Sequence, residues 1–230
     1  MTFASPFSRV IQRPFGGVPS SAVVGGWWDL NGTLSGCVGA WQAKGAASYA
    51  ASLVNLANPG TFDAFAGTAP TWDAATGWTF NGSSQYLRTG LVPLIDQSYS
   101  AIVRIYSTDG VQEAYIWQRG GTGKDFGLYC NTATLFYGWN GGSKSYTVTS
   151  ILNTNAVLAI AGNKSYKDGS VLSGDITTGT PPTDKELYLG AGNNNGSPAF
   201  YFTGNMIAAA VYSTVISSSV AALTTAMNAL

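Results

Sequence analysis

The chain has 230 residues, and eleven Lys and Arg side chains balance eleven Asp and Glu side chains, so its formal net charge is zero. Hydrophobic residues make up 45% of the chain, aromatic residues 13% and charged residues 10%. This composition can form a core and is not that of a disordered chain. The missing basic excess argues against nucleic-acid binding. The length fits one β-rich domain or at most two small ones.

The chain contains no histidine, and this absence excludes several classes of functional site. Ser-His-Asp and Cys-His catalysis both need an imidazole base, and imidazole is the commonest nitrogen ligand of zinc. Two cysteines are too few for a four-thiolate zinc site. Catalysis, if any, is left to carboxylates, Lys, Tyr or a metal held by oxygen ligands.

Residues 1–26 are rich in Pro, Gly and Ser and are predicted to form an extended arm before a domain over 27–230. The arm carries apolar residues that we expect to act as anchors, on the domain itself or on a partner: Phe3, Phe7, Ile11 and Phe15. It lacks the charged segment and apolar run of a secretory signal. No stretch approaches the ~18 apolar residues of a membrane span. We therefore expect a soluble protein that is made in a cytoplasm and does not insert into a membrane.

Ten segments from residue 37 onward are rich in β-branched and aromatic residues and are bounded by Gly, Asn-Gly, Asp-Gly or Pro-Pro turns. The predicted strands cover 37–41, 77–80, 98–106, 114–117, 126–130, 134–138, 145–148, 156–160, 186–189 and 206–212. No helical pattern separates them, which favours an all-β antiparallel sandwich.

The C-terminus is the one segment with a helical pattern. Ser217-Ser218-Ser219 offers an N-cap, and Val220, Leu223, Met227 and Leu230 then fall on one face. Earlier in the chain, Cys37 and Cys130 could form one disulfide, although two small buried thiols are the commoner arrangement for such a pair.

Several segments, in order, resemble laminin-G-like domains of the concanavalin A-like lectin/glucanase superfamily. They are Gly-Cys-Val-Gly-Ala-Trp at 36–41, Gly-Trp-Thr-Phe-Asn-Gly at 77–82 with Tyr-Leu at 86–87, the strand at 98–104, Lys-Asp-Gly-Ser-Val at 167–171, and the closing segments 187–190, 202–207 and 211–213 before the helix. The resemblance spans about residues 36–229. It implies a jelly-roll sandwich of two curved antiparallel sheets with a short C-terminal helix, whose concave face or rim loops often bind glycans.

Hydrolases of this superfamily carry a Glu-x-Asp-x-x-Glu strand motif, which this chain lacks. Its two glutamates, Glu113 and Glu186, are both followed by apolar residues. Asp184 and Glu186 would share one face of a strand, but a charged strand entry explains them better than a catalytic pair. The Gly-rich segment 119–124 fails the phosphate-loop pattern and is predicted to be a hairpin turn. We therefore expect no enzymatic activity.

Calcium in lectin-like sandwiches is held by carboxylate, amide and backbone oxygens on rim loops. The candidate oxygen donors here are Asp125, Asn131, Asp168 and Asn193-Asn194-Asn195. They are not clustered in the sequence, and capping of tight turns explains them better. No cofactor is therefore expected, with calcium kept open.

Glycan binding needs aromatic platforms for the C–H faces of sugars, with planar polar groups for the hydroxyls. Period-2 alternation turns Asp125, Tyr129 and Asn131 away from the apolar side of their strand, and groups Tyr115 with Trp117 opposite Ile116. The candidate carbohydrate-binding residues are Tyr115, Trp117, Arg119, Tyr129, Asn131, Trp139 and Asn140. Burial in the core is the competing explanation for each aromatic residue.

The favoured hypothesis is a non-enzymatic, lectin-like module. The composition, with the anchor-like arm, resembles bacteriophage virion proteins that decorate a capsid or tail. We therefore expect a virion surface protein that contacts other virion proteins or copies of itself, and glycans on the host cell. A stand-alone carbohydrate-binding lectin is the alternative, and a polysaccharide-acting glycoside hydrolase is a weaker one.

Overall fold

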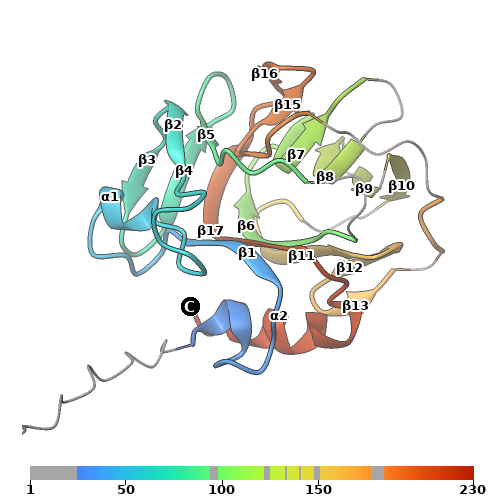
Figure 1. The fold of residues 1–230 in the computed structure, drawn as a ribbon. Coiled ribbons are helices and arrows are strands. Elements are labelled where there is room, and N and C mark those ends of the chain that lie inside the picture. Colours follow the sequence, from blue (N-terminus) through green and yellow to red (C-terminus); the bar gives the residue numbers. More distant parts are fainter. Residues whose placement is uncertain are drawn as a thin grey trace, which may run out of the picture.

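The computed structural model describes residues 25–93, 98–121, 125–132, 134–139, 141–147, 151–172, 174–177 and 184–230. The four predicted anchoring residues, Phe3, Phe7, Ile11 and Phe15, and also Asn140 lie outside these ranges. In the described chain, two antiparallel sheets stack into a sandwich, and a short helix follows at the C-terminus (Figure 1). The predicted all-β fold class is confirmed.

Sheet A has eight strands in the described chain, in the order β13-β12-β11-β6-β17-β4-β3, with β1 also paired to β17. Their bounds are β1 Cys37–Gln42, β3 Thr71–Asp73, β4 Gly77–Asn81, β6 Ser100–Ser107, β11 Asn155–Ala161, β12 Lys164–Lys167, β13 Ser170–Val171 and β17 Thr203–Tyr212. The Asp-Gly hairpin between β12 and β13 forms as expected, because Asp168 and Gly169 both adopt positive φ.

Sheet B has nine strands in the described chain, in the order β10-β9-β8-β7-β14-β5-β2, with β15 paired to β7 and β16. Their bounds are β2 Phe65–Thr68, β5 Tyr86–Arg88, β7 Glu113–Arg119, β8 Asp125–Asn131, β9 Thr134–Trp139, β10 Gly142–Thr147, β14 Tyr188–Leu189, β15 Gly192–Asn194 and β16 Ser197–Ala199. Each of the ten predicted segments contains a strand. The strands before and after the Gly-rich segment 119–124, β7 and β8, pair antiparallel. Residues 122–124 of this predicted hairpin turn lie outside the described ranges.

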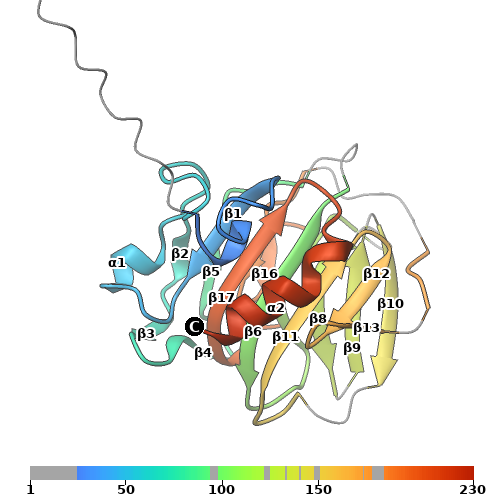
Figure 2. The same ribbon diagram turned by 90° about the horizontal axis from the view of Figure 1, so that it is seen from below.

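The main core fills the space between the sheets and includes Trp41, Trp78, Tyr115 and Tyr137, all fully buried. A second apolar cluster lies on the outer side of sheet A, under helix α2 (Val220–Asn228) and the 3-10 turn η1 (Trp27–Asp29). Figure 2 shows α2 crossing the strands of sheet A. Sheet A is therefore buried on both sides where α2 and η1 cover it: in β6, Ala101 and Val103 belong to the main core and Ile102 to the outer cluster.

Helix α2 buries Val220, Leu223 and Met227 as predicted. Ser219 occupies the N-cap position, as predicted, but its side chain does not cap the helix. The three serines form a 3-10 turn, η2 (Ser217–Ser219), in which Ser219 makes no capping bond and Ser217 Oγ donates to the carbonyl of Ala161 at 3.0 Å. A four-residue helix, α1 (Tyr49–Ser52), was not predicted from the sequence. Among the described residues, no helix is long and apolar enough to cross a membrane.

The two cysteines are not joined by a disulfide. Cys37 lies on β1 of sheet A and Cys130 on β8 of sheet B. Their Sγ atoms donate to the carbonyls of Gly39 and Gly110, each at 3.5 Å. Burial raises the pKa of Cys37 to about 12, so this thiol stays protonated and unreactive at neutral pH.

Candidate functional site: the outer face of sheet B

The outer side of sheet B is the side of the sandwich that carries no helical cover in the described chain. Helix α2 and η1 pack on sheet A, and α1 lies beside the sandwich (Figure 1). Ordinary antiparallel sheets place polar residues on such a face. Several outward residues of sheet B are instead aromatic and contact one another across the strands.

The strand register brings these aromatic residues into line. Trp117 pairs with Tyr188, Tyr188 with Arg88, and Arg88 with Phe65, so side chains from β7, β14, β5 and β2 share one face. Their sequence neighbours Ile116, Leu189 and Leu87 point into the core. We call this surface the aromatic face; its members are Phe65, Tyr86, Arg88, Trp117, Arg119, Tyr129, Phe136, Tyr188, Phe200 and Tyr201.

A pocket of about 260 Å³ lies on the aromatic face. We call it the Trp117 pocket; it is lined by Trp117, Arg119, Asp125, Tyr129, Phe136, Ser143 and Phe200. Tyr129 is its central ring, with centroid distances of 5.7 Å to Trp117, 5.6 Å to Phe136 and 5.2 Å to Phe200. The volume is close to the lower end of the ~300–1,000 Å³ range of small-molecule sites, which suits one or two sugar rings.

Two glycines make room for the indole of Trp117. A Cβ on Gly138 would lie 3.1 Å from Cη2 of Trp117 and 2.9 Å from Cβ of Asp125. Gly127, the cross-strand partner of Trp117, has a φ of +131°, and a Cβ there would lie 2.0 Å from the carbonyl oxygen of Ile116. A side chain at Gly138 would displace the ring, and one at Gly127 would displace the backbone of β7 that carries it.

One ion pair provides the polar side of the Trp117 pocket. Arg119 Nε donates to Asp125 Oδ1 at 2.6 Å and Nη2 donates to Oδ2 at 3.3 Å, a two-point contact. Burial raises the pKa of Asp125, and the Arg119 guanidinium opposes that shift. The two charges cancel and no other charged residue lines the pocket. Its chemistry therefore favours an uncharged ligand that presents both C–H faces and hydroxyl groups.

Trp117, Arg119 and Tyr129, three of the predicted carbohydrate-binding residues, are brought together in this pocket. The expectation that Tyr115 shares their face is wrong. A β-bulge between Ala114 and Ile116 interrupts the alternation of β7, so Tyr115 and Ile116 both enter the core.

The other two described candidates lie outside the pocket. Trp139 ends β9 and packs on the core, with its Nε1 donating to the carbonyl of Tyr99 at 3.1 Å. Trp139 is half-buried and does not line the pocket. Asn131 ends β8, where its Oδ1 accepts from Thr132 Oγ1 at 3.2 Å, and it does not line the pocket.

Phe136, Phe200 and Ser143 were missed by the sequence analysis. For Phe136 a signal exists, since Leu135 and Tyr137 point into the core and the residue between them must point outward. The same alternation turns Arg88 and Tyr188 outward. Phe200 could not be found this way, because it follows the short hairpin strand β16 and reaches the pocket through tertiary packing alone.

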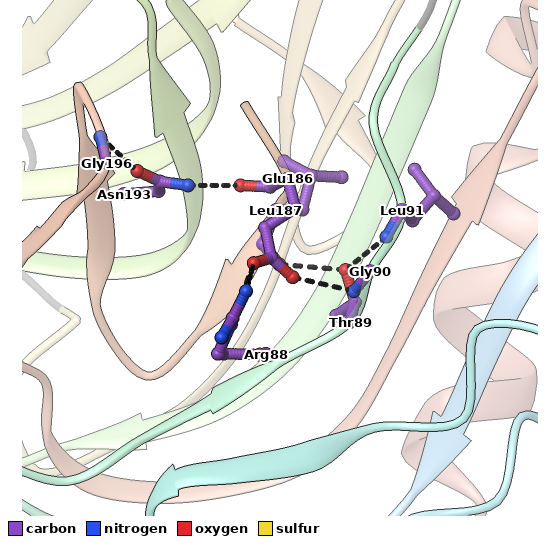
Figure 3. A network of polar contacts seen from close by, with 8 residues as sticks. All are labelled: Arg88, Thr89, Gly90, Leu91, Glu186, Leu187, Asn193 and Gly196. Carbon is purple, nitrogen blue, oxygen red and sulfur yellow. Dashed lines mark hydrogen bonds and ion pairs between the residues drawn. The ribbon is translucent and has the colours of Figure 1, made fainter. Parts of the chain in front are cut away.

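A second hollow, of about 410 Å³, lies beside Arg88 and includes Asp184, Lys185 and Glu186 in its lining. Both carboxylates are engaged: Glu186 accepts from Arg88 Nε at 2.7 Å and from the backbone N–H of Gly90 at 2.8 Å, while Asp184 accepts from Lys185 Nζ at 2.7 Å. Figure 3 shows how the contacts of Glu186 with Arg88 and Gly90 tie β5 and the residues after it to the chain just before β14. They explain Glu186 as a structural residue.

The hairpin of β15 and β16 is tied to the same corner. Asn193 Nδ2 donates to the carbonyl of Glu186 at 2.9 Å, and its Oδ1 accepts from the backbone N–H of Gly196 at 2.8 Å (Figure 3). Both the amide nitrogen and the amide oxygen of Asn193 are thus hydrogen-bonded within the protein. This network holds the rim beside the aromatic face rigidly in place.

The candidate calcium donors are distributed over the molecule. Asp125 pairs with Arg119, and Asp168 accepts from the backbone N–H of Val157 at 2.9 Å. Asn193 ties the hairpin of β15 and β16 to the carbonyl of Glu186. Among the described residues, no group of three or more Asp, Glu or Cys side chains is placed to hold a metal ion. Calcium binding therefore stays a prediction.

No family model and no curated protein matches the sequence. Among solved structures, a Trypanosoma rangeli sialidase mutant displaying trans-sialidase activity aligns with a TM-score of 0.57 at 17% identity, over 84% of this chain and 33% of that chain. The T. rangeli sialidase complex with 2,3-difluorosialic acid aligns with a TM-score of 0.60 at 16% identity over the same shares.

The receptor-binding domain of botulinum neurotoxin D aligns with a TM-score of 0.57 at 12% identity, over 83% of this chain and 52% of that chain. The chain thus spans about a third of the length of the sialidases and half of the toxin domain. At these identities the likeness concerns the fold alone. It places this chain among β-sandwich folds found in sialidases and in a toxin receptor-binding domain.

Proposed function

We propose that the protein is a glycan-binding module and that the Trp117 pocket on the aromatic face holds a sugar ring. The observation that carries this proposal is the clustering of four aromatic rings around a two-point arginine–carboxylate pair on the uncovered side of the sandwich. Aromatic rings stack on the C–H faces of sugars, while the guanidinium donates to hydroxyl oxygens and the carboxylate accepts from hydroxyl groups.

The charge balance of the pocket narrows the ligand class to neutral sugars. Arg119 is already neutralised by Asp125, so the carboxylate of an acidic sugar would find no unpaired cation there and would lie close to the carboxylate of Asp125. We therefore propose that hexoses and N-acetylhexosamines bind more tightly in this pocket than sialic or uronic acids. One of the similar structures holds 2,3-difluorosialic acid, but the likeness at this identity concerns the fold alone and carries no ligand to this chain.

The test is a glycan array probed with the wild-type protein and two matched Phe→Ala variants. Phe136→Ala removes one wall of the pocket, and Phe62→Ala removes an aromatic ring that is 39% exposed and lies outside it. The proposal predicts that the wild type and Phe62→Ala bind the same neutral glycans and that Phe136→Ala loses them. Equal binding by all three proteins, or no binding at all by the wild type, would contradict it.

We propose further that the module is not an enzyme. Asp184 and Glu186 are each bound to a cation, and they are the carboxylates on which the hydrolase alternative rested. Incubation of the glycans bound on the array with the protein should release no reducing ends. Release that disappears in both Asp184→Asn and Glu186→Gln would establish the hydrolase alternative instead.

A role on a particle surface, such as decoration of a virion, is the finer form of this proposal. It is favoured by the position of η1, which packs on the outer side of sheet A, opposite the aromatic face. A segment anchored before Gly25 would leave the aromatic face free. Electron microscopy of source material labelled with an antibody to this chain tests it, with ordered copies on particles expected.

A further inference from the structure

A separate cavity of about 310 Å³ lies on the outer side of sheet A. Its lining comes from β6, β11 and β17 and from the turns around residues 44 and 76. We call it the basic cavity; its polar lining residues are Lys44, Thr76, Arg104, Tyr106, Asn155 and Asn205. It lies next to the C-terminal end of α2, because Arg104 Nη1 donates to the carbonyl of Met227 at 2.7 Å.

Two cationic side chains without a carboxylate partner line the basic cavity. In the described ranges, Arg88, Arg119, Lys164, Lys167 and Lys185 all form ion pairs. Lys44, Arg104 and Lys144 form none among the described residues, and the first two of these line this one cavity. No Asp or Glu lines it, so it holds two uncompensated positive charges in a chain whose net charge is zero.

Arg104 is incompletely satisfied within the protein. Its Nε is buried and has no hydrogen-bond partner among the described residues, and the bond from Nη1 to Met227 is the one the guanidinium makes there. Burial also lowers the pKa of Arg104 from its ordinary value, as happens when a cation loses water without gaining an anion. A buried donor of this kind costs free energy unless a ligand completes it.

Asp73, the acidic residue closest in sequence to the lining residues Ala75 and Thr76, is engaged elsewhere. Asp73 Oδ1 accepts from the backbone N–H of Ala75 at 2.8 Å, and Asp73 forms no ion pair with Lys44 or Arg104. The amide of Asn205 donates to Thr79 Oγ1 at 2.6 Å, which orients its carbonyl oxygen and leaves that atom to accept from a hydroxyl group. The cavity thus offers two cations together with uncharged hydrogen-bonding groups.

We propose that the basic cavity binds a small polyhydroxylated anion, namely a sugar that carries a carboxylate or phosphate group, with the anionic group between Lys44 and Arg104. A guanidinium and an ammonium suit an oxyanion. The cavity volume of about 310 Å³ is about ten times the ~30 Å³ share of one water molecule. The cavity is therefore larger than a bare oxyanion needs. The amide and hydroxyl side chains of Thr76, Tyr106, Asn155 and Asn205 suit the sugar hydroxyls.

This site is independent of the Trp117 pocket in position and in charge. The two lie on opposite outer sides of the sandwich, and the Trp117 pocket is electrically balanced whereas the basic cavity is not. The protein would then hold neutral sugars on sheet B and an acidic sugar on sheet A.

The experiment is isothermal titration calorimetry of the full chain at low ionic strength with glucuronate, N-acetylneuraminate, glucose 6-phosphate, inorganic phosphate and glucose. The proposal predicts that at least one charged sugar binds more tightly than both glucose and inorganic phosphate, with an affinity that falls as salt is added. Lys44→Gln should weaken that binding by roughly tenfold or more. Lys144→Gln, which removes an equally unpaired lysine on β10, should leave it unchanged, as should Phe136→Ala in the Trp117 pocket.

Arg104→Gln should abolish the binding, and Lys44→Gln keeps the test valid if loss of the Met227 contact prevents the arginine variant from folding. The proposal is overturned if no charged sugar binds, if Lys44→Gln and Lys144→Gln bind it equally, or if inorganic phosphate binds as tightly as the tightest charged sugar. Loss of binding in Phe136→Ala would assign the anion to the other face and would equally overturn it.

Discussion

At the scale of single residues, a buried carboxylate controls how stability depends on pH. Glu113 is fully buried, accepts from Ser107 Oγ at 2.6 Å and from the backbone N–H of Thr203 at 2.8 Å, and has its pKa raised by burial. A raised pKa means that the folded state favours the protonated form. The corresponding stability is complete below the ordinary pKa of Glu and is lost as pH rises through the raised value.

The stability of Glu113→Gln relative to wild type should therefore increase as pH rises from about 4 to about 7. The relative free energy of unfolding should change by about 1.4 kcal/mol for each unit by which the pKa is raised. Urea unfolding at several pH values measures this, with Asp184→Asn, an exposed carboxylate, as the control. A difference between wild type and Glu113→Gln that stays constant with pH would contradict the prediction.

Asp125 links pH to the proposed binding. Burial raises its pKa despite Arg119, so on acidification it should be protonated at a higher pH than an ordinary Asp. The carboxylate then no longer neutralises Arg119 or accepts two sugar hydroxyls. Neutral-glycan affinity should therefore fall as pH is lowered through this pKa, and Asp125→Asn should remove that pH dependence. An unchanged pH profile in Asp125→Asn would separate Asp125 from binding.

At the scale of elements, α2 stabilises the molecule by covering sheet A. Leu223 is fully buried between α2 and the sheet. Leu223→Ala should lower the free energy of unfolding by about 2–5 kcal/mol, as expected for a core leucine. Thr225→Ala, on the exposed side of the same helix, should change it by less than about 0.5 kcal/mol. Thermal unfolding compares the two, and similar losses would show that α2 is not packed as described.

The longer strands could be predicted from local pattern, whereas short ones such as β2, β3, β15 and β16 were not predicted, and the site could only be predicted in part. Alternation in β8 places Tyr129 outward, and the alternation of Trp117 with Ile116 in β7 predicts the same for Trp117. The bulge that buries Tyr115 depends on the pairing of β7 with β8, and the burial of Trp139 depends on the distant carbonyl of Tyr99. Such non-local contacts leave no mark in a short segment of sequence, and the same is true of Phe200.

At the scale of the whole molecule, the sandwich has two different outer sides. Sheet A is covered by α2 and η1 (Figures 1 and 2), and sheet B presents the aromatic face. The described chain begins with contacts of its own: Gly26 N–H donates to Asp29 Oδ1 at 2.7 Å, and Trp27 Nε1 donates to Gln42 Oε1 at 3.0 Å. The folded unit thus includes residues from Gly25 onward.

Deletion of residues 1–24 should therefore leave the melting temperature within a few degrees of the full chain, because η1 keeps its contacts with sheet A. Differential scanning calorimetry of the two proteins checks this. A lower melting temperature that corresponds to a loss of several kcal/mol in the free energy of unfolding would show instead that the arm covers an edge strand of the sandwich.

The most direct test of the glycan-binding account is a titration of isotopically labelled protein with neutral mono- and disaccharides, followed through the indole N–H signals of its tryptophans. Trp117 lies in the proposed pocket, whereas Trp78 is fully buried and donates to Ser52 Oγ at 2.8 Å. The account predicts that at least one neutral sugar shifts the Trp117 signal and the backbone signals of Tyr129 and Phe136, while the Trp78 signal stays in place. Shifts that avoid these three residues, or no shift with any neutral sugar, would contradict it.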